Sequence, residues 1–339
     1  MAFIFSDSFD HYTVLSIAAP NKWTSVAGTP TIGANGRNGS KGVVLDASDV
    51  IKKTIGVNTN KIFVGFALKV TTVYNAELPL LTFRRANADQ CTITLGPNLL
   101  LQARTGSSVG TLIATATRAL PFNAYRYVEV GITVGDATGT IEVRIDGVAV
   151  INEVNVDTKG TAVADLDEIW IGAGGGTPAI AVDDVYILDN TTVDLNTYLG
   201  DVYMQLLLSD GAGSQTDFTL VGAATNWEAV KEIPPDDDTS YVGSTVVGNE
   251  DLYTFGALGL AVATIKACVV NIRARKTDAG VRTIRAEARQ NVTTGESADI
   301  SVGDDYEFFQ SAFPNNPDTG VAWTIAGVDS AEFGVKDQA

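Results

Sequence analysis

One strictly alternating segment, GTIEVRIDGVAVI at residues 139–151, constrains the fold of this chain more than any other. Ile141, Val143 and Ile145 alternate with charged residues, which gives a strand one apolar face and one polar face. The Asp-Gly pair at 146–147 tolerates the positive φ angles of a tight turn, and a second apolar run follows it. The segment therefore predicts a β-hairpin with one buried face.

Similar strand-like runs, separated by Gly, Asn and Asp turn signals, fill the first part of the chain. They occur at residues 40–46, 61–70, 78–84, 91–95, 99–103, 125–134, 140–151, 168–172 and 180–188. About ten strands in ~190 residues match a two-sheet jelly roll, and no segment keeps helical periodicity over three turns. We expect an all-β protein, with a jelly roll over 1–195 and a second, smaller β-sandwich over 196–339.

The second unit is predicted to contain one further hairpin. Residues 265–276 and 281–290 flank the turn sequence TDAG, and their apolar side chains are expected to face inward together. The polar segment after residue 208 is expected to be a long loop, and 321–335 a closing strand.

The outer face of that predicted hairpin would carry four arginines, Arg273, Arg275, Arg285 and Arg289. Such a basic patch on an acidic domain could dock against an acidic surface of a neighbouring subunit. The alternative is an exposed face of mixed charge.

Composition excludes several classes of protein. The net charge of −17 and the pI near 4.4 make nucleic acid a poor partner. Two cysteines, Cys91 and Cys268, exclude a scaffold held together by several disulfides. No run approaches the roughly 20 apolar residues of a membrane helix, so no membrane insertion is expected. Asp7 and Asp10 interrupt the apolar N-terminus too early for a signal peptide, which predicts synthesis in a cytoplasm without export by that route.

Catalytic signatures are sparse. His11 is the only histidine, so a nucleophilic triad would have to use it, and the usual zinc ligand sets are disfavoured. A pair of carboxylates, as in glycosidases, is the remaining enzymatic option. Glu129 and Glu142 are candidates by strand alternation alone, and an exposed strand face explains them better.

Two groups of aspartates are candidate cation ligands. Asp183 and Asp184 lie within the apolar strand AIAVDDVYIL, so one of them must point toward the interior and needs a partner. A structural Ca²⁺ would provide one, with help from Asp7 or Asp10; the alternative is hydrogen bonding to backbone N–H groups or to an arginine. The run at 236–238 lacks the spacing of an EF-hand loop, and a solvated turn is the better interpretation.

Aromatic residues offer a further binding hypothesis. Trp23, Trp170, Trp227 and Trp323 could stack on sugars if they line a concave face. Trp170 alternates with isoleucines and Trp323 lies in the run VAWTI, so both are predicted to be core residues.

Four segments in order, YRYVEVGITV, GTIEVRIDGVAVI, DEIWIGAG and IAVDDVYILD, resemble the concanavalin A-like, laminin-G-like jelly rolls. The resemblance covers residues 1–190 and implies the fold. It indicates little about function, because this fold serves lectins, adhesins, hydrolases and inert scaffolds alike.

The whole chain also resembles structural proteins of tailed bacteriophages. The segments that carry this resemblance are LGDVYMQLLLSDG, EIPPDDDTSYV, KTDAGVRTIR and WTIAGVDSAEFGVK. It implies a non-enzymatic virion protein, on the capsid surface or the tail, that attaches to other virion proteins through one β-domain and exposes the other. A homo-oligomer would follow. The alternatives are a carbohydrate-binding adhesin for host surface glycans and a glycan-cleaving enzyme.

Overall fold

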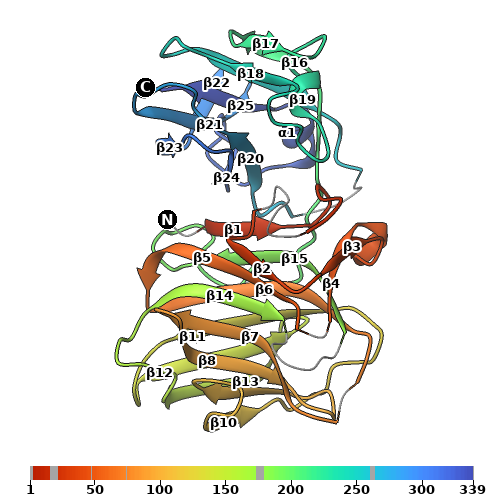
Figure 1. The fold of residues 1–339 in the computed structure, drawn as a ribbon, viewed down its shortest axis with the longest axis vertical. Helices are drawn as coiled ribbons and strands as arrows, with labels where there is room; N and C mark the ends of the chain where they lie inside the picture. Colours follow the sequence, from red (N-terminus) through yellow and green to blue (C-terminus); the bar gives the residue numbers. More distant parts are fainter. Residues whose placement is uncertain are drawn as a thin grey trace. The chain divides into compact units, whose positions relative to one another are not determined.

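The computed structural model describes residues 3–15, 22–46, 48–73, 75–172, 179–259 and 264–338. The chain divides into two compact units, 1–204 and 205–339 (Figure 1). Strands dominate both units, and the α-helix seen in the described ranges, α1 (Ile325–Asp329), is only 5 residues long. The expected all-β class is therefore confirmed. The sequence placed the unit boundary at 195/196, whereas the first unit continues to Met204.

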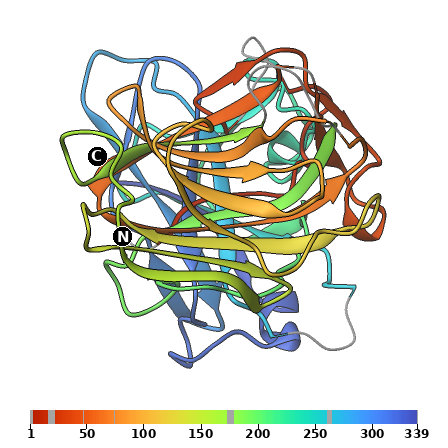
Figure 2. The same cartoon turned by 90° about the horizontal axis from the view of Figure 1, so that it is seen from below.

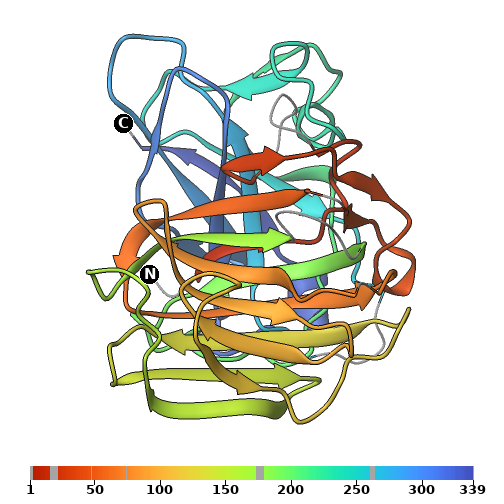
Figure 3. The same ribbon diagram turned by 60° about the horizontal axis from the view of Figure 1, so that its bottom comes forward.

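In the described part of the first unit, strands form two antiparallel sheets. The eight-stranded sheet has the order β13 (Val148–Val156), β12 (Gly139–Ile145), β11 (Arg126–Thr133), β6 (Lys61–Val70), β15 (Ile180–Leu188), β4 (Gly42–Leu45) and β3 (Thr31–Gly33), with β1 (Phe3–Asp7) also paired to β15. A short 3₁₀ turn, η1 (Arg37–Gly39), precedes β4. Figure 2 and Figure 3 show the long strands of this unit running alongside one another.

The seven-stranded sheet is the second layer of the jelly roll. Its order is β10 (Leu112–Thr115), β9 (Leu101–Thr105), β8 (Ala88–Leu95), β7 (Leu78–Arg85), β14 (Leu166–Gly172), β5 (Val50–Thr59) and β2 (Ser25–Ala27).

One apolar core lies between the two sheets, because alternate residues of facing strands point into it. Ile141, Val143 and Ile145 of β12 are 0–1% exposed and pack there with Ile169 and Ile171 of β14. A fully buried side chain of this kind contributes about 1.5–3 kcal/mol to folding.

The hairpin predicted at residues 139–151 is confirmed. β12 pairs with β13, and the turn residues Asp146 and Gly147 have φ angles of 53° and 75°. Two consecutive positive φ angles match the twist of the flanking strands, and Asp-Gly is among the few residue pairs that adopt them at low cost.

In the second unit, the described residues form a six-stranded sheet and two strand pairs. The sheet has the order β16 (Ser209–Thr216), β19 (Glu250–Phe255), β25 (Glu332–Asp337), β21 (Arg282–Gln290) and β22 (Thr293–Glu296), with β23 (Ile300–Val302) also paired to β21. The strand pairs are β17 (Thr219–Val221) with β18 (Tyr241–Gly243) and β20 (Cys268–Ala274) with β24 (Glu307–Phe313); a 3₁₀ turn, η2 (Glu228–Val230), lies between β17 and β18.

A smaller apolar core holds the second unit together. Ala286 and Ala288 of β21 meet Trp323, Val328 and Phe333 there. Trp323 is 3% exposed, so its predicted core position is confirmed.

Three local predictions for the second unit are wrong. β20 pairs with β24 and β21 pairs with β25, so residues 265–290 contain two strands but no hairpin. The polar segment after residue 208 is strand β16, and its edge pairing with β19 satisfies the backbone despite the glycines. The segment predicted as a strand over 321–335 contains α1 at 325–329, and the strand β25 begins only at Glu332; Thr324 caps α1 by accepting a hydrogen bond from the Gly327 amide at 3.0 Å.

Candidate functional site

A row of side chains crosses the outward face of the seven-stranded sheet. These positions alternate with core residues such as Ile51, Phe83 and Ile169, so the pleat turns them away from the core. The registers of neighbouring strands place them opposite one another. In order across six strands, the row is Ser25 (β2), Lys52 (β5), Trp170 (β14), Thr82 (β7), Thr92 (β8) and Arg104 (β9). We call these six residues the polar row.

Trp170 stands in the middle of the polar row, so its predicted position in the core is wrong. Ile169 and Ile171 occupy the inward positions of β14, and the half-buried indole takes the outward one. The Lys52 Nζ atom lies 4.0 Å from the ring centroid, and the Arg84 guanidinium carbon lies 3.6 Å from it. Cations over an indole face are attracted by the ring quadrupole. The Trp170 Nε1 atom is buried without a hydrogen-bond acceptor in the structure.

Arg104 closes one end of the row. Its Nε and Nη2 atoms donate to Glu77 Oε1 and Oε2 at 2.5 and 2.7 Å, which is a bidentate pair. These bonds lower the pKa of Glu77 below its ordinary value. Thr94 also donates to Glu77, so the guanidinium is held in one orientation against the sheet.

Arg84 is held in a comparable way beside Trp170. Its Nε donates to Asp89 Oδ1 at 2.7 Å, and its Nη1 lies 3.5 Å from Glu168 Oε2. Arg84 is 8% exposed. The ion pairs fix the position of the guanidinium next to the indole without removing its charge.

A loop is fastened over the edge of this face by Gln90, which is fully buried. The Gln90 side chain donates to the carbonyls of Val163 and Asp165 and accepts from the Thr161 amide at 3.0 Å. The loop comes so close to β8 that a Cβ atom on Gly160 would lie 2.3 Å from the Asp89 carbonyl oxygen. Gly160 is therefore required for this approach.

The polar row offers groups that can bind a polar ligand. Its half-buried side chains carry ammonium, guanidinium and indole groups, which can bind a polar ligand. Thr82 and Thr92 are 7% and 1% exposed, and the Thr92 hydroxyl donates to the Gly106 carbonyl at 2.7 Å. The carboxylates of Glu77, Asp89 and Glu168 are engaged with Arg104 and Arg84.

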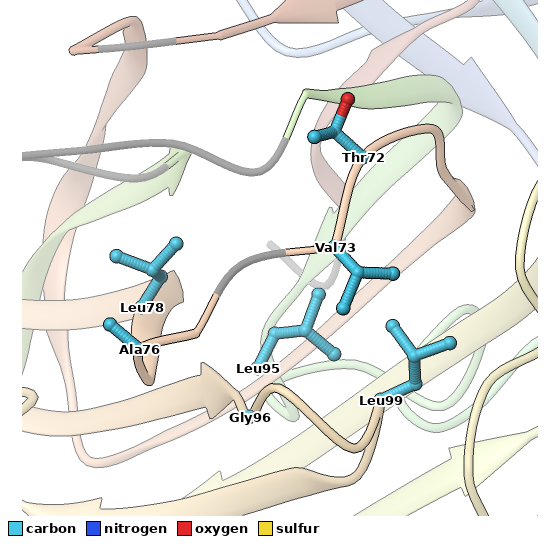
Figure 4. Close-up of a pocket in the computed structure, with 7 residues that line it drawn as sticks. All are labelled: Thr72, Val73, Ala76, Leu78, Leu95, Gly96 and Leu99. Carbon is cyan, nitrogen blue, oxygen red and sulfur yellow. The ribbon is translucent and has the colours of Figure 1, made fainter.

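A shallow hollow lies elsewhere on this unit, at the ends of β7 and β8 (Figure 4). It encloses no space for a water molecule, and it is lined by Thr72, Val73, Ala76, Leu78, Leu95, Gly96 and Leu99. This lining contains a single hydroxyl and no charged group, so it offers no chemistry for a polar ligand.

The outward face of the eight-stranded sheet is covered by the end of the first unit. Tyr198, Leu199, Val202 and Met204 pack on an apolar strip of Phe63, Tyr127, Tyr186 and Leu188. We call residues 195–204 the covering segment. Its contact with the sheet is close: a Cβ atom on Gly131 would lie 2.2 Å from the Tyr198 hydroxyl.

Glu129, a candidate carboxylate from the sequence, holds the covering segment in place. It is fully buried, and its Oε1 accepts from the Tyr186 hydroxyl at 2.5 Å and from the Gly200 amide at 2.8 Å. Glu142 lies on the next strand and receives a hydrogen bond from Arg144 Nε at 2.7 Å. The two glutamates therefore face the chain's own segment and its own arginine.

Asp183 and Asp184, the predicted calcium ligands, are both buried and accept several hydrogen bonds. Asp183 accepts from the Asp184 amide, the Arg37 amide and the Ser40 hydroxyl. Asp184 accepts from Arg37 Nε and Nη2 at 2.9 and 2.7 Å, and from the Met204 amide at 2.8 Å. Donors of the chain thus reach all four carboxylate oxygens.

The electrostatics of this aspartate pair are unusual. Burial, together with the charge of Asp184, raises the pKa of Asp183 to about 7, and burial also raises that of Asp184. Asp7, suggested as a further ligand, has partners of its own in Lys22 and Trp23. The structural Ca²⁺ stays a prediction.

The four arginines of the predicted interaction face are separated: Arg273 lies on β20 with Arg275 just after it, and Arg285 and Arg289 lie on β21 of another sheet. Arg273 and Arg275 bind Asp237 and Asp238. Arg285 binds Glu296 and Asp299, and Arg289 donates to the Asn291 carbonyl. The single face expected from a hairpin of residues 265–290 is therefore not formed, and two residues of the aspartate run at 236–238 pair with arginines.

His11 is 15% exposed and lies beside a buried charged cluster. Its Nδ1 atom is 3.9 Å from Asp7 Oδ1. Burial and the positive charge of Lys22 lower the pKa of His11 to about 3, against the opposing effect of Asp7. The imidazole is neutral at neutral pH.

Comparisons with known proteins give structural matches only. No family model matches the chain, and no curated protein matches it. An endo-β-1,4-glucuronan lyase from Trichoderma reesei is 16% identical over 55% of this chain and 95% of its own length, with a TM-score of 0.41. An alginate lyase from Aplysia kurodai is 8% identical over 56% and 99%, with a TM-score of 0.44. Domain 4 of an arabinanase from Geobacillus stearothermophilus is 19% identical over 56% and 92%, with a TM-score of 0.38.

These matches correct the functional prediction from the sequence. The proteins are described as enzymes, or parts of enzymes, that act on polysaccharides, which contradicts the prediction of a non-enzymatic virion structural protein. Identities this low do not transfer an activity or a substrate to this chain. The virion location and the homo-oligomer stay predictions. Among the described residues, no helix has the length and apolar character to span a membrane.

Proposed function

We propose that the first unit binds a polysaccharide chain along the polar row of the seven-stranded sheet. The observation that carries this proposal is the register, which aligns Lys52, Trp170, Thr82, Thr92 and Arg104 across adjacent strands. Neighbouring strands lie about 4.8 Å apart, so a row across six strands extends over about 24 Å. A row of that length suits an extended polymer better than a single sugar.

The groups in the row match the chemistry of a sugar polymer. Sugar hydroxyls both donate and accept hydrogen bonds, and the Lys52 ammonium and the arginine N–H groups are suitable donors to them. The ion pairs of Arg84 and Arg104 hold both guanidinium groups in position before a ligand arrives. Such preorganisation reduces the entropy lost on binding.

The other outward face of the jelly roll does not offer a comparable surface. The covering segment packs on it and occupies the hydrogen-bonding capacity of Glu129 Oε1 and Asp184. The seven-stranded sheet is therefore the face that supports a ligand of this size.

The proposal is tested by measuring the binding of the purified full chain to soluble polysaccharides. A neutral set (glucans, xylans, arabinans) and an acidic set (alginate, glucuronan, pectate) separate the two kinds of polymer. Trp170→Ala is expected to weaken binding about tenfold or more. The matched control is Trp227→Ala, because Trp227 in the second unit also carries a cation over its ring, with Lys231 Nζ at 4.1 Å.

Wild-type protein that binds no polymer of either set, or Trp170→Ala protein that binds as tightly as wild type, would overturn the proposal. The same samples are assayed for new reducing ends and for unsaturated ends. Their appearance would add cleavage to binding and show which bond is broken.

A further inference from the structure

Three glutamates meet on one face of the six-stranded sheet in the second unit. Glu250 begins β19, Glu287 lies in β21 and Glu296 ends β22. Glu287 is directly opposite Glu296 in the pairing of β21 with β22. The neighbours of Glu287 along β21, Ala286 and Ala288, point to the core, so Glu287 points to the other side of the sheet.

The spacing of these carboxylates fits a single metal ion. One oxygen from each of the three glutamates lies within 4.8 Å of the other two. Oxygen ligands of Ca²⁺ lie about 2.3–2.6 Å from the ion, so two ligands on opposite sides are about 5 Å apart. The three oxygens can therefore contact one ion with little rearrangement.

Glu287 is the strongest evidence for a missing partner. It is 0% exposed, and neither of its carboxylate oxygens accepts a hydrogen bond in the structure. A buried carboxylate without a partner is costly, and native proteins nearly always supply one. Burial and the charge of Glu250 raise the pKa of Glu287 to about 7, the expected response to this lack of compensation.

Lys336 is the only ammonium group that an ion pair joins to this cluster within the described residues. Its Nζ lies 3.1 Å from Glu250 Oε1 and 2.8 Å from Glu296 Oε1. Arg285 contacts the second oxygen of Glu296 at 2.5 Å. Neither cation forms an ion pair with Glu287. The charges of Lys336 and Arg289 act against the rise of its pKa, but neither carboxylate oxygen has a direct partner.

We propose that Glu250, Glu287 and Glu296 form a site for a hard divalent cation, with Ca²⁺ as the favoured ion. Carboxylate oxygens are the ligands that Ca²⁺ takes in proteins, and water completes its coordination. The Lys336 ammonium leaves the site on its flexible side chain when the ion binds. The bound ion joins β19, β21 and β22, and it supplies the partner that Glu287 lacks.

The test is calorimetric titration of the chelator-treated full chain with CaCl₂, together with thermal unfolding with and without the ion. Wild-type protein is expected to bind one Ca²⁺ and to unfold at a higher temperature when it is present. Glu287→Gln is expected to weaken Ca²⁺ binding about tenfold or more. The control is Glu307→Gln, an exposed glutamate on β24, which should bind Ca²⁺ as wild type does.

A second variant keeps the proposal falsifiable if Glu287→Gln fails to fold. Lys336→Met removes the competing ammonium and should bind Ca²⁺ more tightly than wild type. No heat of binding in either wild type or Lys336→Met would overturn the proposal. Equal affinities of Glu287→Gln and wild type would also overturn it. The site lies in the second unit and does not depend on the polysaccharide proposal.

Discussion

The two outward faces of the jelly roll are built from the same kind of strand but have different neighbours. Both carry charged and aromatic residues at alternate positions. On the eight-stranded sheet, Glu129 and Asp184 bind backbone amides of the covering segment. On the seven-stranded sheet, Arg84 and Arg104 bind side chains of their own surface. The comparison shows two ways of holding a polar residue on a strand face: backbone amides of a returning segment bind it on one sheet, and neighbouring side chains bind it on the other.

The largest expected loss of stability comes from removing the Asp184 carboxylate on the covered face of the eight-stranded sheet. The Asp184→Ala substitution leaves the Arg37 guanidinium and the Met204 amide without their buried acceptor. Removing one partner of a buried ion pair costs about 3–5 kcal/mol, so the free energy of unfolding should fall by that amount in urea titrations.

Asp201→Ala is the matched control for Asp184→Ala, because Asp201 pairs with the same Arg37 but its side chain is 56% exposed. An exposed pair contributes about 1 kcal/mol or less. Equal losses from the two substitutions would show that the covering segment does not make Asp184 structural.

A steric change tests the packing of the covering segment. The new Cβ atom of Gly131→Ala would lie 2.2 Å from the Tyr198 hydroxyl. Overpacking of this kind costs about 1–3 kcal/mol. Adding Tyr198→Ala should restore part of the loss, and thermodynamic additivity of the two changes would contradict direct contact.

Lowering the pH should reduce the free energy of unfolding through His11, which lies beside Asp7 at the end of β1. The pKa of His11 is about 3 in the folded protein, below its ordinary value of 6.5. His11 must therefore be unprotonated in the folded protein. Its contribution to the free energy of unfolding is complete above pH 6.5 and is lost as the pH falls toward 3. The loss is about 1.4 kcal/mol per pH unit in that window, or about 2 kcal/mol at pH 5.

The difference between wild type and His11→Gln isolates the contribution of His11 in urea titrations at pH 7, 6 and 5. Asp183, with its pKa raised to about 7, has the opposite sign over part of this range, because folding takes up its proton. That contribution is common to both proteins and cancels in the difference. A difference that does not change with pH would contradict the lowered pKa of His11.

The smallest effect on stability is expected on the open face. Trp170→Ala should lose about tenfold or more in polysaccharide affinity, while the free energy of unfolding should fall by less than the ~3–5 kcal/mol that a fully buried tryptophan costs, because the indole is only half-buried. A large loss of stability in urea would show that Trp170 is a structural residue, as the residues of the covered face are.

The strand Gly139–Ile145 and its turn show which parts of the fold could be predicted. Alternation over seven residues determines which side chains share a face, and Asp146-Gly147 determines where the chain turns. Both depend on interactions between residues close together in the chain, so short-range patterns contain them. The same reasoning located β6, β7, β11, β14 and β15.

Pairing between distant segments could not be predicted in this way. Cys268–Ala274 and Arg282–Gln290 are strands, as expected, yet their partners are β24 and β25, which follow later in the chain. Any two amphipathic strands offer the same backbone hydrogen bonds, so the choice of partner depends on side chains that the tertiary fold brings together.

The same distinction applies to the candidate site: patterns within one strand could be read from the sequence, and contacts between distant segments could not. Alternation along the strand shows that Trp170 points to the opposite side from Ile169 and Ile171. It does not show which of the two sides faces the core. Likewise, nothing near Glu129 in the sequence indicates that residues 195–204 return over it. The all-β character and the main strands of the jelly roll were thus present in local patterns. Only the tertiary structure determined that residues 195–204 pack on the eight-stranded sheet, because that contact joins segments far apart in the chain.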